Sequence, residues 1–265
     1  MQAWQVVFSV PKHGNSPAEW EDGAAAAPAV PGRGPRFAVA DGATQGFGST
    51  RWAMRLVEGF VGEGAGGEVP DLTTEPLSRW VRRTQDRWRH DPLLAHATDM
   101  EVYKLETVGS FATFLGCEFV DLDGPHPHWS AVAIGDTVLF QVRGGELVAQ
   151  FPPIPPHGFG FNPDGLPTGP EALDDVVDRM LFDEGVLLDG DVVYLATDAF
   201  ADWVLRENER DRREPWTTLA GLDHPERFRA LVDDLRRADE MANDDVTLMR
   251  VSIAAAGPEN LVVCL

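Results

Sequence analysis

Four aspartates lie where a short apolar run of the sequence ends or where a strand-like run begins. They are Asp41, Asp136, Asp198 and Asp244. Carboxylates at strand ends from distant parts of a chain can converge on one spot, where mutual repulsion makes the cluster costly unless a cation neutralises it. Hard divalent cations such as Mg²⁺, Mn²⁺ and Ca²⁺ take oxygen ligands. The pattern therefore predicts a metal site built from oxygen atoms.

Composition excludes some classes of partner. The chain has 265 residues and a formal net charge of -21. Non-specific binding to nucleic acid or to an anionic membrane needs a basic footprint, so we expect neither partner. The apolar fraction of 43% is ordinary for a globular protein with a full core.

The cysteines and the N-terminus indicate in which cellular compartment we expect the protein. Cys117 and Cys264 form no framework of bridges and no Cys-x-x-Cys spacing. Met1–Gln5 lacks the basic and apolar regions of a signal peptide, and no apolar run approaches the length of a membrane span. We expect a soluble protein in a reducing compartment, most simply the cytoplasm.

The first third of the chain predicts strands followed by helices. Residues 4–10 and 36–40 read as strands, and the Gly/Pro-rich stretch 11–36 between them reads as a connection that carries Glu21 and Asp22. Apolar residues in 53–61 and 77–88 follow the i, i+3, i+4 spacing of amphipathic helices.

The remainder alternates in blocks. Strands are predicted at 111–119, 129–134, 137–142, 192–196 and 246–253, and helices at 173–181, 199–207 and 228–238. The three strands between residues 111 and 142 have no long helix between them, which favours antiparallel pairing. Such blocks suggest sheets packed on each other with helices outside. No domain boundary is evident, so we expect one domain over 1–265, with the Pro/Gly-rich segment 151–170 as a long surface loop.

Six short motifs occur in a fixed order along the chain. They are Trp20–Ala24, Ala40–Gly42, Gly109–Thr113, Ile134–Thr137, Ala196–Ala199 and Asp244–Thr247. In this order they resemble the Asn-Glu-Asp-Ala, Ala-Asp-Gly, Gly-Gly-Thr-Thr, Gly-Asp-Ser, Ser-Asp-Gly and Asp-Asn-Ile-Thr elements of the PPM, or type 2C, metal-dependent protein serine/threonine phosphatases. Each motif alone is weak, but the ordered series covers the chain from about Val6 to Ile253.

The resemblance implies an α+β fold, a four-layer α-β-β-α sandwich of two antiparallel sheets flanked by helices, with a binuclear Mg²⁺ or Mn²⁺ centre at one edge. By position, Asp41 would bridge the two ions. Glu21 and the backbone carbonyl of Gly42 would hold one ion. Asp198 and Asp244 would hold the other.

Further roles follow from the same resemblance. Asp136 would lie beside a third, weaker ion shared with Asp198, and Asp22 would hydrogen-bond metal-bound water. The implied activity is hydrolysis of phosphoserine and phosphothreonine in proteins by attack of metal-activated water, opposing a serine/threonine kinase. The 151–170 segment falls near the family's variable flap and would influence substrate choice. Asp245 is expected to be a turn residue or to support the ligands.

The sequence also departs from the family pattern. The arginine that grips the substrate phosphate, four residues before Glu21, is Pro17 here. The histidine that some members carry after the Asp-Gly is Ala43, and the glycine after the third aspartate is Ala199. Three basic residues could take the place of the missing arginine, namely Lys12, His13 and Arg33.

Two rival functions remain open at this stage. Pro17 and Ala199 are compatible with a pseudophosphatase that keeps the fold and binds phosphoproteins or scaffolds a signalling complex. An acidic Ca²⁺-binding module is the second rival, although the Asp-x-Asp-x-Asp-Gly loop of an EF-hand is absent.

Overall fold

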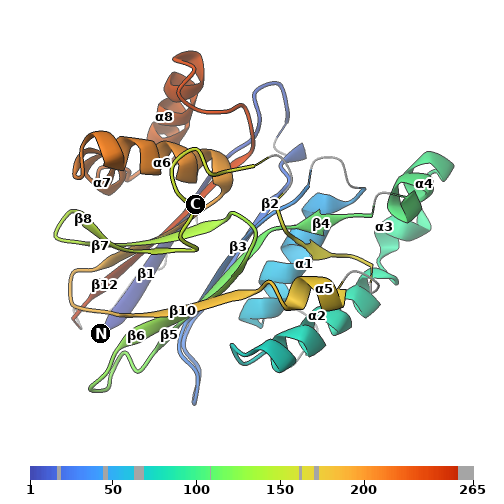
Figure 1. Cartoon of the computed structure of the whole chain (residues 1–265), viewed down its shortest axis with the longest axis horizontal. Coiled ribbons are helices and arrows are strands. Elements are labelled where there is room, and N and C mark those ends of the chain that lie inside the picture. The colour runs from blue at the N-terminus through green and yellow to red at the C-terminus, as the bar shows by residue number, and fades with distance from the viewer. Residues whose placement is uncertain are drawn as a thin grey trace.

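Two five-stranded antiparallel sheets pack face to face in the computed structural model, with helices on both outer sides (Figure 1). The structure describes residues 1–16, 19–43, 47–62, 69–107, 109–160, 163–169 and 173–255. This arrangement confirms the predicted α+β class and its four α-β-β-α layers. Pro17 and Cys264, which the sequence singled out, lie outside the described residues.

The first sheet has the strand order β1-β12-β11-β7-β8. Its strands are β1 (Gln2–Val10), β12 (Val246–Ala254), β11 (Val192–Ala196), β7 (Val138–Arg143) and β8 (Glu146–Phe151). The second sheet has the order β10-β6-β5-β3-β2. Its strands are β10 (Leu181–Val186), β6 (His128–Ile134), β5 (Phe114–Val120), β3 (Arg36–Asp41) and β2 (Asp22–Ala27). A two-stranded piece pairs β4 (Phe111–Ala112) with β9 (Leu166–Pro167).

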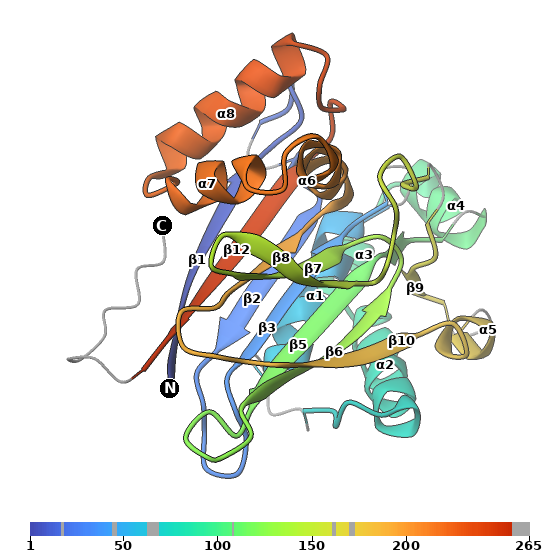
Figure 2. The same cartoon turned by 60° about the vertical axis from the view of Figure 1, so that its left-hand side comes forward.

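Helices cover the two sheets from opposite sides (Figure 2). Those on the side of the second sheet are α1 (Ser49–Val61), α2 (Thr74–Trp88), α3 (Pro92–Ala95), α4 (Asp99–Thr107) and α5 (Leu173–Val177). Those on the first sheet are α6 (Asp198–Arg210), α7 (Glu214–Ala220) and α8 (Pro225–Arg237). Within the described residues, no helix combines the length and apolar character needed to cross a bilayer.

Strand β3 is buried on both faces, which is why its sequence is apolar without alternation. Phe37 and Val39 belong to the core between the two sheets. Ala38 and Ala40 belong to the core beneath α1, and their small side chains let that helix lie close to the sheet. The strand then ends at Asp41, at the edge of the sandwich.

Several element predictions were wrong. The stretch 11–36, expected to be a connection, contains β2, whose sequence Asp-Gly-Ala-Ala-Ala-Ala carries no β-branched residue. Residues 173–181, expected to be one helix, end their helix at Val177 and begin β10 at Leu181. The sequence did not predict α3, α4 or α7. The predicted 151–170 loop is interrupted by β9. That this loop acts as a flap, and that residues 1–265 form one domain, both stay predictions.

Candidate metal centre

Asp22 and Asp41 are direct partners across two antiparallel strands. Asp22 begins β2 and Asp41 ends β3, and the register pairs them. Burial raises the pKa of Asp41 well above its ordinary value, and the charges of Asp22, Asp198, Asp244 and Asp136 raise it further. Five carboxylates from five separate segments therefore act on one another electrostatically at this edge.

Asp22 is fully buried and joins three segments. Its Oδ2 atom accepts a hydrogen bond of 2.6 Å from the hydroxyl of Thr247 and one of 3.3 Å from the hydroxyl of Thr197. Thr197 directly precedes Asp198, and Thr247 follows Asp244 by three positions. Burial raises the pKa of Asp22 to about 8, although the hydrogen bond from Thr247 opposes the shift. The other oxygen, Oδ1, is buried and has no hydrogen-bond partner among the described residues.

Asp136 lies in the turn between β6 and β7 and is 5% exposed. Burial, followed by the charge of Asp198, raises its pKa to about 7. Both of its carboxylate oxygens are buried without a partner among the described residues. The next residue, Thr137, shares a hydrogen bond of 2.7 Å with Thr113, whose hydroxyl also accepts the backbone N–H of Asp41 at 3.3 Å. The two threonines thus fix the Asp136 turn against the end of β3.

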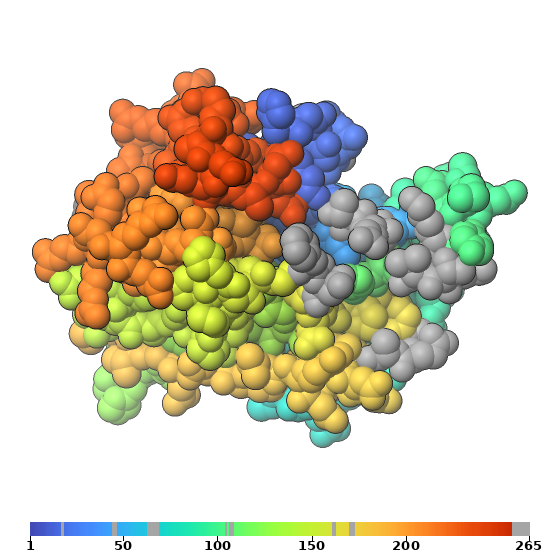
Figure 3. Space-filling model, turned by 45° about the horizontal axis from the view of Figure 1, so that its top comes forward, coloured from blue at the N-terminus to red at the C-terminus, as the bar shows by residue number. Residues whose placement is uncertain are grey.

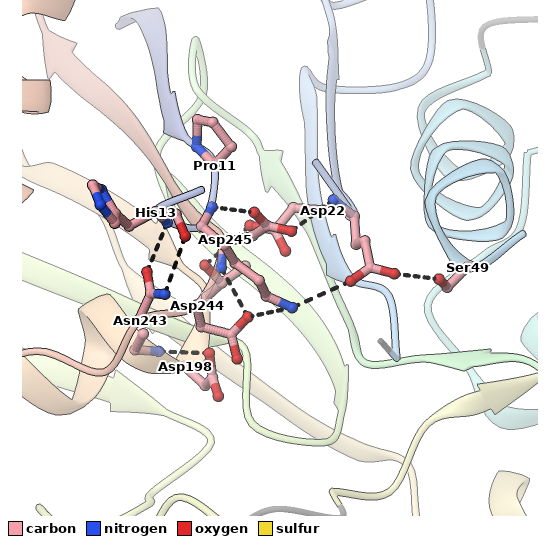
Figure 4. A network of polar contacts seen from close by, with 12 residues as sticks. Pro11, His13, Asp22, Ser49, Asp198, Asn243, Asp244 and Asp245 are labelled. Atoms are coloured by element: carbon pink, nitrogen blue, oxygen red, sulfur yellow. Dashed lines mark hydrogen bonds and ion pairs between the residues drawn. The ribbon is translucent and has the colours of Figure 1, made fainter. Parts of the chain in front are cut away.

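Asp198 and Asp244 come from the ends of two neighbouring strands of the first sheet. Asp198 follows β11 and starts α6, and its Oδ1 accepts the backbone N–H of Ala199 at 2.6 Å. Burial raises the pKa of Asp198 to about 6, and the charge of Asp244 adds to the shift. Figure 4 shows the two side chains next to each other.

A lysine ammonium lies among these carboxylates. The Nζ atom of Lys12 is 3.2 Å from Oε2 of Glu21 and 3.0 Å from Oδ1 of Asp244 (Figure 4). Although burial alone would lower the pKa of Lys12, the hydrogen bonds and charges of Asp244 and Glu21 raise it. The side chain therefore carries a positive charge at this position.

Glu21 is held by its neighbours on both sides. Its Oε1 accepts the hydroxyl of Ser49, the first residue of α1, at 3.0 Å. Gly42 makes this approach possible, because a Cβ atom there would lie 2.6 Å from the carbonyl oxygen of Glu21 and 2.9 Å from the carbonyl carbon of Ser49. The glycine of the Ala-Asp-Gly motif is thus required by close packing.

Asp245 holds the backbone of two residues at the site in place. It is 2% exposed. Its Oδ1 accepts the backbone N–H of Lys12 at 2.7 Å, and its Oδ2 accepts that of Glu21 at 2.9 Å. Its two oxygens are therefore directed at the backbone, which fits a supporting role.

The chemistry of these residues suits a divalent metal. The donors are all oxygen, the carboxylates repel one another, and Asp22 and Asp136 carry buried oxygens without partners among the described residues. These properties suit a hard cation. As the side chains stand, however, no three His, Cys, Asp or Glu residues of the described chain are gathered closely enough to hold an ion. Binding of an ion at this edge would therefore require these side chains to reorient.

The structure brings together Glu21, Asp22, Asp41, Asp136, Asp198 and Asp244, the carboxylates predicted from the sequence. Of the three basic residues considered in place of the missing arginine, Lys12 contacts the cluster. His13 donates its backbone N–H to Asn243. The guanidinium of Arg33 lies near Gly62, beyond the end of α1.

Sequence reasoning missed the hydroxyl groups that orient the carboxylates. Thr197 and Thr247 stand inside the Ala196–Ala199 and Asp244–Thr247 motifs, and Thr113 closes the Gly109–Thr113 motif. Their presence in the motifs was a signal, because a hydroxyl beside a strand-end carboxylate can donate to a buried neighbour. Ser49 carried no such signal in the sequence.

Solved structures of several protein phosphatases have a fold similar to that of this chain. The catalytic domain of the serine/threonine protein phosphatase PstP, in complex with two manganese ions, has a TM-score of 0.59 at 17% identity, covering 96% of this chain and 99% of that one. A serine/threonine phosphatase of S. agalactiae has a TM-score of 0.61 at 13% identity, with 95% and 100% covered. The photosystem II phosphatase PBCP has a TM-score of 0.57 at 14% identity, with 96% and 100% covered.

These structures confirm at the level of the fold the resemblance to the PPM phosphatases. At such low identity the likeness concerns the fold alone. No sequence-family model matches the chain, and no curated protein matches it significantly in sequence.

Proposed function

We propose that the chain is a metal-dependent protein serine/threonine phosphatase of the PPM type that removes phosphate from phosphoserine and phosphothreonine. The observation that carries the proposal is the convergence of Asp41 with four further aspartates at one edge of this fold. Each is the carboxylate expected from the ordered motifs. The manganese ions bound by PstP, which has the same fold, support Mg²⁺ or Mn²⁺ as the cofactor.

The proposed ligand set is the one that the ordered motifs imply. Asp41 is central and would contact two ions. Glu21 and the carbonyl of Gly42 lie on the α1 side and would complete one shell. Asp198 and Asp244 lie on the side of the first sheet and would complete the other.

Asp136 and Asp22 would act beside these two ions. Asp136, with two unpartnered oxygens, would contribute to a third ion shared with Asp198. When bound, the two ions at Asp41 would supply an activated water and would stabilise the charge on the phosphate oxygens during displacement at phosphorus. Asp22 would orient that water through Oδ1, while Thr247 and Thr197 hold Oδ2 in place.

We expect the segment after β8 to influence which phosphoproteins are accepted. Ile154 and Phe159 pack against the core beneath α6, and His157 donates its backbone N–H to Asp202 of α6 at 2.9 Å. Figure 3 shows this segment, in yellow-green, lying against the orange helices. Because α6 begins at Asp198, the segment lies on the helix that starts at the site. The proposed substrate is a phosphoprotein in a pathway with an opposing serine/threonine kinase.

A non-catalytic phosphoprotein-binding role is the second candidate. It is favoured by the ammonium of Lys12, which lies among the carboxylates that would hold the ions. A protein in which this contact persisted in the presence of metal would keep the fold without turnover.

Hydrolysis of a chromogenic aryl phosphate with Mn²⁺ separates the two candidates. We expect turnover that needs Mn²⁺ and falls by about 100-fold or more in Asp41→Asn and Asp198→Asn, since loss of a group that stabilises the transition state has effects of this size. Asp183→Asn, an exposed carboxylate on β10, is the matched control and should retain activity. No turnover by wild type at saturating Mn²⁺ would favour the binding role.

A further inference from the structure

The position of Lys12 has a consequence for how the site takes up metal. Its Nζ lies between Glu21, on the α1 side of the cluster, and Asp244, on the side of the first sheet. The two carboxylates belong to the two different ion sites proposed above. One ammonium therefore pairs with a carboxylate of each half of the centre.

The backbone of Lys12 is anchored, so a displacement of the ammonium would come from the side chain alone. Asp245 accepts the backbone N–H of Lys12 at 2.7 Å. Arg236 donates to the carbonyl of the preceding residue, Pro11, at 2.9 Å and to the carbonyl of Asp244. Lys12 thus belongs to a segment that is anchored to Asp244 and Asp245, and this segment holds the ammonium close to the carboxylates.

The side chain is also shielded from solvent, which strengthens its interactions. It is 15% exposed and Glu21 is 17% exposed, whereas Asp244 is 41% exposed. The pair with Glu21 is therefore screened less by salt than a pair on an open surface. A divalent ion that approaches Glu21 or Asp244 competes with this ammonium, because two cations near the same carboxylates repel each other.

We infer that Lys12 is a built-in competitor of the divalent metal: its ammonium bridges Glu21 and Asp244 and neutralises their charge, and metal binding displaces it. The inference rests on the proposed metal centre. The lysine lowers the affinity for metal and stabilises the metal-free protein. The side chain then raises the concentration of metal at which the site loads.

Calorimetric titration of metal-free protein with Mn²⁺ tests the inference without any assay of activity. Lys12→Met removes the charge and keeps most of the side-chain length. We expect it to bind Mn²⁺ roughly tenfold more tightly than wild type, a change within the usual range of coupling between two binding events. Lys12→Arg keeps the charge and should bind within about threefold of wild type.

Arg227→Gln is the matched control for net charge. Arg227 lies on α8, is 66% exposed and pairs with Asp223. Its loss changes the net charge by the same amount as Lys12→Met, but at a remote and screened position. We expect its affinity for Mn²⁺ to equal that of wild type.

Thermal unfolding provides a second readout. Metal-free Lys12→Met should melt below metal-free wild type, and saturating Mn²⁺ should raise its melting temperature by more than it raises that of wild type. Equal affinity and an equal rise in wild type and Lys12→Met would overturn the role of Lys12 and leave the metal centre standing. No heat of Mn²⁺ binding in either protein would overturn the proposed function, and this inference with it.

Discussion

Thr247 on β12 donates a hydrogen bond of 2.6 Å to Oδ2 of Asp22 at the start of β2. The two strands belong to different sheets, so this bond joins the sandwich at the edge where the carboxylates meet. Asp22 is fully buried. An unsatisfied buried acceptor is costly, which makes the bond important both for stability and for the orientation of Asp22.

Thr247→Val should lower the free energy of unfolding by about 1–3 kcal/mol, because it removes the donor and leaves the buried oxygen with the longer bond from Thr197. Urea unfolding of the metal-free protein measures the change. Thr217→Val, on the exposed side of α7, is the control and should change stability by less than about 0.5 kcal/mol. Equal effects at the two positions would show that the hydroxyl of Thr247 is not needed.

Gly42→Ala should disturb the centre through the backbone. The new Cβ would meet the carbonyl oxygen of Glu21 at 2.6 Å and the start of α1 at 2.9 Å. We expect a loss of about 1–3 kcal/mol in the free energy of unfolding, as for an overpacked core, together with weaker binding of Mn²⁺ as Glu21 is displaced. Gly160→Ala is the control, since its Cβ would meet nothing within 4 Å. Wild-type affinity in Gly42→Ala would contradict the role of this close packing.

The metal-free protein should lose stability as the pH rises from about 4 to about 8. The pKa of Asp22 is raised by burial from 3.8 to about 8, and that of Asp136 from 3.8 to about 7. Between these values the folded chain holds protons that the unfolded chain has lost, so the free energy of unfolding falls with increasing pH. Chemical unfolding at a series of pH values, with a chelator present, measures this slope.

Two comparisons isolate the carboxylates from the general effect of the acidic surface. Asp22→Asn should flatten the slope, whereas Asp183→Asn, at an exposed position on β10, should leave it unchanged. Added Mn²⁺ should stabilise wild type more at pH 8 than at pH 5, since ligand carboxylates must lose their protons to bind metal. The same slope in Asp22→Asn and wild type would refute the assignment.

The sequence was sufficient for the convergence of the carboxylates but not for its details. Asp41 and Asp198 each follow an apolar run that is buried on both faces of a sheet, so the sequence could predict their position near a strand end. The sequence could not predict the strand β2, because its alanines lack the β-branched side chains that are typical of strands. Its presence depends on the pairing of Asp22 through Ala27 with β3 and on close contact with α1.

The sequence offered Lys12 as one of three candidate basic residues, but it did not predict that the ammonium lies between Glu21 and Asp244. No periodicity relates it to Asp244, and its contact depends on the backbone bonds that Asp245 makes to residues 12 and 21. Similarly, the sequence did not predict β10, which is an edge strand. Asp183 and Glu184 are exposed there, so the strand lacks the alternation of apolar and polar residues that marks a half-buried strand. Long-range pairing, and not local propensity, determines both features.

A crystal structure of the protein soaked in Mn²⁺, with anomalous scattering used to locate the metal, tests the central claim most directly. We predict two manganese ions that share Asp41 as a ligand, one also bound by Glu21 and the other by Asp198 and Asp244, with the ammonium of Lys12 moved away from Glu21. The absence of any anomalous peak in contact with Asp41 at saturating Mn²⁺ would contradict the assignment of this cluster as a metal centre.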